Sequence, residues 1–494
     1  MASPRNKLVE WLLPLLAAIL FVGLLAPRGS DVAVRSWTFD GICREMVAGT
    51  TEGRQALVGS LWHAPLPTLA GLPAAALLPG GGAVPLVSRV TVLIALACLF
   101  RLLLHFCRRS LPPWTGFDCW LITLLLLASR AEAVLEPQAA VTLTVATLTL
   151  IKFADWYATR QLEDLVKFAF ALALLALCGA PLAGLTLLLA LLLPIVALLD
   201  PVRRPRFQGL LILGLLPALY AMGIWTLMSR LILSDALYAC RFLIRGLTRW
   251  QGWSINALQF HDIAALACCG LLALLAAAHR DQRTTLLGLG GVALGIWILV
   301  LHGLGFAWAA GTATTMLTLI ALLMLIATLQ AAHAHPPARI RRGAALLCTA
   351  VLAVAWVRGA LQEPGYRSIT QSRQTRCALL DAIENDVMSR TPYGRIFVCS
   401  YRGLGLLEGE QRERFVACLD LHVGTLRERY TRQNLFLLVP RPEAEAALEC
   451  TVWRHGDIYS HGMERALFAG DWGDWRLYEI VTAPLAEQLD EWRR

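Results

Sequence analysis

Charged side chains are scarce in this chain of 494 residues. Asp, Glu, Lys and Arg together make up 16% of it and hydrophobic residues 57%, against about 25% and about 45–50% in soluble domains. An ordinary soluble enzyme is therefore not expected. Metal-binding cysteine patterns are also missing, because the thirteen cysteines include no Cys-x-x-Cys pair and no Cys/His cluster at ligand spacing. The sequence thus gives no zinc signal.

The few charges divide the chain into two parts. Residues 1–358 hold 27 basic and 15 acidic side chains, whereas residues 359–494 hold 17 and 20. The first part is too apolar to dissolve in water, and the second has the charge density of a globular domain. The basic residues form short clusters between apolar runs rather than a continuous stripe, so nucleic acid is not an expected partner. We predict a transmembrane domain over 1–358 and a soluble domain over 359–494.

Eleven apolar runs approach the length of about 20 residues that a transmembrane helix needs. If the N-terminus lies inside, most Arg and Lys clusters also fall inside, as the positive-inside rule requires. The protein is then a multi-pass protein of the cytoplasmic (inner) membrane, and the odd number of spans places the C-terminal domain outside. Two outer loops, at about 28–85 and 228–261, are longer than a connection needs, which indicates function. The predicted spans are 9–27, 86–104, 117–130, 138–154, 165–178, 182–199, 207–227, 262–278, 285–301, 313–331 and 343–358.

The C-terminal domain has the pattern of a small α/β fold. Its strand, long helix and second strand form a βαβ pattern, which predicts at least one parallel pair of strands. Its four cysteines would face an oxidising compartment, which allows one or two disulfides and leaves their pairing open. The predicted elements are a helix at about 368–390, a strand at 395–400, a helix at about 408–431, a strand at 434–440, a helix near 456–468 and a strand at 475–481.

Carboxylates at the outer ends of apolar helices are the candidate reactive groups, because charge in a membrane is costly unless it is paired or used. Asp31 directly follows the first span, and Asp40 comes later in the same loop. Glu136 occupies the tight turn between the third and fourth spans. For Asp31 taken alone, the alternative is a solvated acid at the end of a helix.

The segments around these acids resemble the polytopic GT-C glycosyltransferases, the superfamily of the protein O-mannosyltransferases and aminoarabinose transferases. Its members typically begin with one span and an outer loop that starts with an acid. An amphipathic helix that ends near a Gly and then a Pro-Leu element follow. Here Asp31 matches the acid and Gly49 ends the helix, while His63, Pro65 and Leu66 match the Pro-Leu element.

Two further positions carry the resemblance. Arg89 lies at the start of the second span, where members often have an Arg, and Glu136 in Leu-Glu-Pro-Gln-Ala-Ala matches a second acid after the third span. One position departs from the pattern, because Val32 follows Asp31 where members commonly have a second acid. A two-carboxylate metal site is therefore not expected there, and use of a divalent metal stays open.

The resemblance implies both a fold and a reaction. The fold would be a GT-C-like polytopic α-helical membrane protein of about 11 transmembrane helices, with a small C-terminal α/β soluble domain. The reaction would move a sugar from a polyprenyl-phosphate donor to a lipid, glycan or protein acceptor on the outer face, where no nucleotide sugars are available. Asp31 would act as the catalytic base and Glu136 would support it. Such general-base help contributes about 10²–10⁴-fold to a rate.

The substrate would be held by Asp40, His63 and three arginines of the second long loop. Arg241, Arg245 and Arg249 are spaced i, i+4 and i+8, which places them on one face of an interfacial helix. Guanidinium groups grip phosphate oxygens with two hydrogen bonds and would stabilise the leaving lipid phosphate. The alternative is a helix whose arginines reach anionic headgroups.

Two other functions stay open at this point. The missing acidic pair makes a non-catalytic membrane assembly protein of GT-C ancestry an alternative to the enzyme. A transporter or flippase for a lipid-linked substrate is the second alternative. Transporters usually show repeated halves and ionisable residues near mid-membrane, whereas this sequence has no clear repeat and its acids cluster at the outer face.

Overall fold

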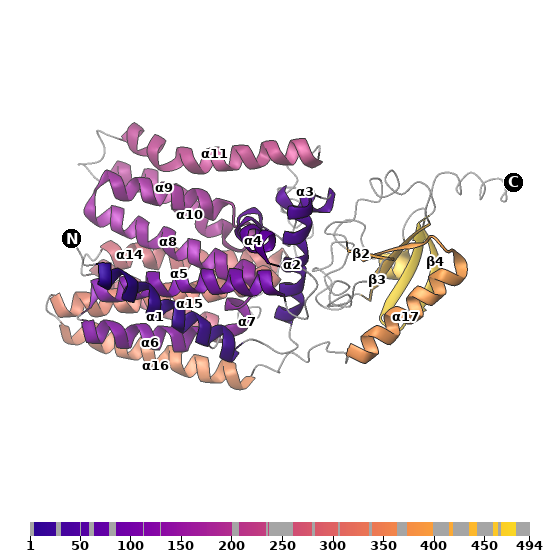
Figure 1. Cartoon of the computed structure of the whole chain (residues 1–494). Helices are drawn as coiled ribbons and strands as arrows, with labels where there is room; N and C mark the ends of the chain where they lie inside the picture. Colours follow the sequence, from indigo (N-terminus) through magenta and orange to yellow (C-terminus); the bar gives the residue numbers. More distant parts are fainter. Residues whose placement is uncertain are drawn as a thin grey trace.

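A computed structural model of the chain consists of a long helical body and a small sheet domain (Figure 1). Most of the body's helices run side by side along one direction, and the sheet domain lies beyond one of its ends. The structure describes residues 4–480 except 26–30, 50, 59–63, 79–84, 112, 129, 200–206, 234–235, 237–259, 279–281, 305–306, 335–337, 363–372, 399–413, 418–433, 442–457 and 463–465.

Each of the eleven predicted apolar runs falls on a helix of the body. Within the described residues, five of these helices are long and apolar enough to cross a membrane, namely α5, α8, α11, α14 and α15. The predicted fold class, a polytopic helical body of membrane type with a small α/β domain, is thereby confirmed. The helices are α1 (Pro4–Leu25), α5 (Leu86–Ser110), α6 (Pro113–Ala128), α8 (Pro137–Thr159), α9 (Leu162–Ala176), α10 (Ala183–Leu199), α11 (Phe207–Leu233), α13 (Phe260–Ala278), α14 (Gln282–Gly303), α15 (Ala307–Ala334) and α16 (Ala338–Gln362).

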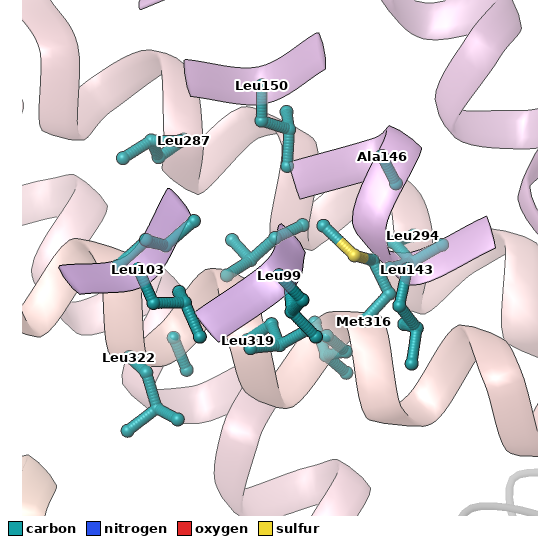
Figure 2. Close-up of a cluster of buried hydrophobic side chains, with 14 of the residues drawn as sticks. Leu99, Leu103, Leu143, Ala146, Leu150, Leu287, Leu294, Met316, Leu319 and Leu322 are labelled. Carbon is teal, nitrogen blue, oxygen red and sulfur yellow. The ribbon is translucent and has the colours of Figure 1, made fainter. Parts of the chain in front are cut away.

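The centre of the body is a tightly packed set of aliphatic side chains (Figure 2). It joins α5, α8, α14 and α15, and the side chains drawn there come from all four helices. Leu99, Leu143, Leu294 and Leu319 have no exposed surface. Since lipid tails are as apolar as leucine, van der Waals packing rather than the hydrophobic effect holds such helices together in a membrane.

Shorter helices gather at one end of the body, which we call the α2 end. They are α2 (Asp31–Ala48), α3 (Thr51–Val58), α4 (Pro65–Leu77), α7 (Ala131–Val134) and the 3₁₀ turn η1 (Ala180–Leu182). Figure 1 shows α2 running across the ends of the long helices, and it packs against α3, α4, α5 and α8. The predicted helix ending at Gly49 is confirmed, because α2 stops at Ala48 and Gly49 has a φ of +68°, a conformation that glycine adopts without strain.

The α2 end also contacts α11, the most exposed of the long helices. The indole nitrogen of Trp225 in α11 donates a hydrogen bond to the carbonyl of Val58, the last residue of α3. Side chains on the remaining faces of α11, such as Leu219 and Tyr220, are two-thirds exposed. This exposure suits a helix that faces lipid.

The first helix starts at one end of the body, and α17 (Arg373–Arg390) lies beyond the other end. Figure 1 shows the start of α1 at the end far from α2 and shows α17 beyond the α2 end. This arrangement agrees with an odd number of membrane-spanning helices. Which end faces the outside stays a prediction from the charge pattern.

The sheet domain has five strands in the order β2-β1-β3-β5-β4. β1 pairs in parallel with β2 and β3, so the predicted parallel pair is confirmed, whereas β5 pairs antiparallel with β3 and β4. The apolar side of α17 covers one face of the sheet, and α21 packs on the other. The bounds are β1 (Arg395–Val398), β2 (Phe415–Ala417), β3 (Leu435–Pro440), α21 (Ile458–His461), β4 (Ala466–Trp472) and β5 (Trp475–Ile480).

Two predicted helices of this domain are wrong in part. The predicted helix at 408–431 contains strand β2, whose Phe-Val-Ala run extends the parallel sheet beside β1. The predicted helix at 456–468 shrinks to the single turn α21, because β4 begins at Ala466 and pairs with β5. A two-residue turn joins these strands, in which Gly473 has a φ of +66°, and such glycine-containing turns favour hairpins.

Candidate functional site

The segments that carry the family resemblance meet at the α2 end. The backbone nitrogen of Ala64, just before α4, donates a hydrogen bond to Oε1 of Gln138 in the first turn of α8, at 3.3 Å. The nitrogen of Leu66 donates to the carbonyl of Leu177 after α9, at 3.2 Å. The Pro-Leu element is thereby bonded to the start of α8, where the second predicted acid lies.

Glu136 is the residue at which α8 begins. It occupies the N-cap position with extended backbone angles (φ −70°, ψ 127°), is half-buried, and makes no side-chain capping bond. Acidic side chains are favoured at the N-terminus of a helix, which carries partial positive charge. The structure therefore places Glu136 at the same end of the body as α2, which contacts α8.

Asp31 is the first residue of α2, and its side chain lies outside the described part of the chain. The helix that begins with Asp31 packs on α4 and α5. Phe39 and Cys43 of α2, Ala75 of α4 and Val87 of α5 form one small buried cluster. The structure thus determines which helix presents Asp31, and at which end of the body.

Asp40 is buried inside the α2 end, with 7% of its side chain exposed. Its Oδ2 accepts a hydrogen bond from Nε of Arg44 at 2.6 Å, and its Oδ1 accepts one from the nitrogen of Val87 at 2.8 Å. Both oxygens are therefore bonded within the protein. That Asp40 contacts substrate stays a prediction, and these bonds favour a structural role.

The remaining predicted site residues fall outside the described part of the chain. They are His63, Arg241, Arg245 and Arg249. Their roles in holding a substrate and its phosphate stay predictions. Within the described residues, no group of three or more His, Cys, Asp or Glu side chains is arranged to hold a metal ion.

A buried ion pair at the α2 end was missed by the sequence reasoning. Nη2 of Arg130, at the start of α7, lies 3.7 Å from Oδ1 of Asp262 in the first turn of α13. The side chains are 17% and 3% exposed. The criterion that selected the other acids, a carboxylate at the outer end of an apolar helix, also fits Asp262. The ion pair holds α7, the short helix that precedes Glu136, against α13.

Close packing between α2 and α4 depends on Gly71, and we expect a side chain there to separate the two helices. A Cβ atom at this position would lie 2.6 Å from Sγ of Cys43 and 2.8 Å from the ring of Phe39. Gly71→Val is therefore expected to lower the free energy of unfolding by about 1–3 kcal/mol, the usual cost of overpacking. Thermal unfolding of the full chain in detergent measures this change.

Gly223→Val is the matched control for this prediction. Gly223 lies in the apolar helix α11, and a Cβ atom there meets nothing within 4 Å. The control should unfold at the wild-type temperature. Equal unfolding temperatures for the two variants would show that α2 and α4 are not packed as described.

Comparisons with known proteins give a weak likeness to a solved structure. No protein-family model matches the chain, and no curated protein matches it. Among solved structures, the chain is similar to the crystal structure of ArnT from Cupriavidus metallidurans in the apo state. The two share 14% sequence identity and a TM-score of 0.47, over 98% of this chain and 99% of that one. A likeness of this size does not identify a family or an activity.

Proposed function

We propose that the protein is a membrane glycosyltransferase that moves a sugar from a polyprenyl-phosphate donor to a hydroxyl of an acceptor on the outer face. One observation carries the proposal. The helix that begins with Asp31, the Pro-Leu element at the start of α4 and the first turn of α8 with Glu136 converge at one end of the body. These are three of the segments on which the resemblance to GT-C glycosyltransferases rests.

The proposed reaction is a single displacement. The carboxylate of Asp31 takes the proton from the acceptor hydroxyl as its oxygen bonds to the anomeric carbon. The bond between that carbon and the phosphate oxygen breaks, and the polyprenyl phosphate leaves with the electron pair. Attack from the side opposite the leaving group inverts the configuration of the sugar. Glu136 supports Asp31 from the start of α8.

The leaving phosphate needs positive charge near the membrane surface. Arg241, Arg245 and Arg249 supply it in this proposal, because guanidinium groups placed where negative charge develops stabilise a transition state. Within the described residues, Arg44 and Arg130 at the same end each form an ion pair with a carboxylate. Arginines from the second long loop therefore fit the task better than either of these two.

The proposal predicts that transfer requires a lipid-linked donor. Purified protein in liposomes, supplied with a radiolabelled sugar on polyprenyl phosphate and an extract of cell-envelope acceptors, should form a labelled product. The same sugar on a nucleoside diphosphate should give none, because the proposed leaving group is a lipid phosphate. The label is measured in acceptor fractions separated from the donor by chromatography, and liposomes without protein are the control.

Two results would contradict the enzyme assignment. Movement of the intact labelled lipid between leaflets, with no new glycosidic bond, would identify a flippase. Absence of both transfer and lipid movement, with every candidate sugar, would favour a non-catalytic assembly protein. Transfer from the nucleotide sugar would instead place the reaction on the other side of the membrane.

A further inference from the structure

A carboxylate and a guanidinium of α2 bond this helix to two others. Asp40 accepts hydrogen bonds from Arg44 and from the nitrogen of Val87 in the first turn of α5. Arg44 in turn donates from Nη1 to the carbonyl of Leu78, the C-cap of α4, at 3.1 Å. One ion pair therefore connects α2 to the end of α4 and to the beginning of α5.

The charges of this pair match the helix ends that they contact. The N-terminus of a helix carries partial positive charge and the C-terminus partial negative charge. The carboxylate of Asp40 lies at the N-terminus of α5, and the guanidinium of Arg44 lies at the C-terminus of α4. The pair is mostly screened from water, since the two side chains are 7% and 27% exposed. Removing either partner leaves the other buried without its counter-charge.

The pair also determines where the first residue of α2 lies. The small apolar cluster beneath α2 holds the helix against its neighbours and by itself constrains its rotation and its position along its axis less than hydrogen bonds do, because apolar contacts have little directionality. Hydrogen bonds to two other helices fix both. Asp31 stands nine residues before Asp40 on the same helix, about 14 Å along its axis at the usual rise per residue.

We propose that Asp40 and Arg44 are positioning residues that hold α2, and with it Asp31, in place for the transfer reaction. This inference rests on the proposed function, because it concerns the alignment of the proposed base. A shift of about 1 Å in a reacting group can lower a rate about 10²-fold. The pair therefore acts on the chemical step through the placement of Asp31, without touching the substrate.

The first test measures the position of α2 without using activity. Hydrogen exchange, followed by mass spectrometry on the full chain in nanodiscs, reports the opening of local structure. Asp40→Ala is expected to raise exchange in peptides from α2 and in the peptide that contains Val87. Glu163→Gln is the matched control, because Glu163 and Lys167 form an exposed i, i+4 pair on α9. Unchanged exchange in Asp40→Ala would overturn the inference.

The second test separates placement from substrate binding. Asp40→Ala is expected to lower kcat by about 10–100-fold while the donor KM changes less than about threefold. Asp40→Asn should fall in between, because its amide oxygen still accepts the bond from Val87, and it keeps the comparison usable if the alanine variant fails to fold. Adding Arg44→Ala to Asp40→Ala should lower kcat little further, since the two residues act as one unit.

The outcomes distinguish this inference from the proposed function. A raised KM with unchanged kcat would assign Asp40 to substrate binding and overturn the positioning role. If the wild type transfers sugar and Asp40→Ala has the same kcat, the positioning role is also overturned, while the proposed function stands. If the wild type transfers no sugar but Asp40→Ala raises hydrogen exchange in α2, the proposed function fails. The conclusion that the Asp40–Arg44 pair keeps α2 in place is then still supported.

Discussion

Replacing Asp31 with Asn is expected to lower kcat for sugar transfer by about 10²–10⁴-fold, the range that general-base catalysis contributes. The asparagine keeps the shape of the side chain and loses the negative charge that accepts the proton. Binding of the lipid donor depends on other groups, so its KM should change little. Initial rates with the labelled polyprenyl-phosphate donor, at saturating acceptor, measure both constants.

Asp118→Asn is the control for this variant. Asp118 is exposed and lies near the start of α6, which begins at the end of the body far from α2, so its loss should leave kcat unchanged. Wild-type kcat in Asp31→Asn would remove Asp31 from the mechanism. A raised KM with normal kcat would make it a binding residue instead.

Removing one partner of the Arg130–Asp262 pair is expected to destabilise the protein by about 3–5 kcal/mol. The cost is large because the remaining charge stays buried without its partner, and Asp262 is only 3% exposed. Arg130→Gln and Asp262→Asn should therefore both unfold at clearly lower temperatures than the wild type. Thermal unfolding in detergent, followed by the loss of monodisperse protein, measures the change.

The double variant gives the sharper form of this test. Arg130→Gln combined with Asp262→Asn leaves no buried charge, so it should be more stable than the sum of the two single changes predicts. Lys167→Gln breaks the exposed pair on α9 and should leave unfolding unchanged. Additive losses in the double variant would mean that Arg130 and Asp262 do not interact.

Hydropathy predicted the helical body well because the membrane environment demands long apolar helices. All eleven predicted runs fall on helices, although the ends differ by several residues, as for α11, which continues to Leu233 where 227 was predicted. Such ends depend on contacts that hydropathy does not contain. Trp225 of α11, for instance, is bonded to Val58 of α3.

The roles of individual acids were harder to predict, because they depend on residues distant in the sequence. Asp31 and Asp40 belong to the same helix, and no local pattern indicates which of them is bonded to the start of α5. Arg130 lies at the start of α7 and Asp262 in the first turn of α13, so their pairing follows only from the packing of the body. By contrast, the β4–β5 hairpin had a local signal, the Gly-Asp turn, that the sequence reasoning passed over.

The bond between Trp225 and Val58 links the α2 end to the surrounding lipid. α11 has 27 residues and is therefore about 40 Å long, longer than the hydrocarbon layer of about 30 Å. A helix with such an excess is accommodated by tilting, by kinking or by local thickening of the bilayer, and α11 contains Pro217. Because α3 is bonded to α11 and packs on α2, the orientation of α11 in the bilayer is mechanically connected to the helix that begins with Asp31.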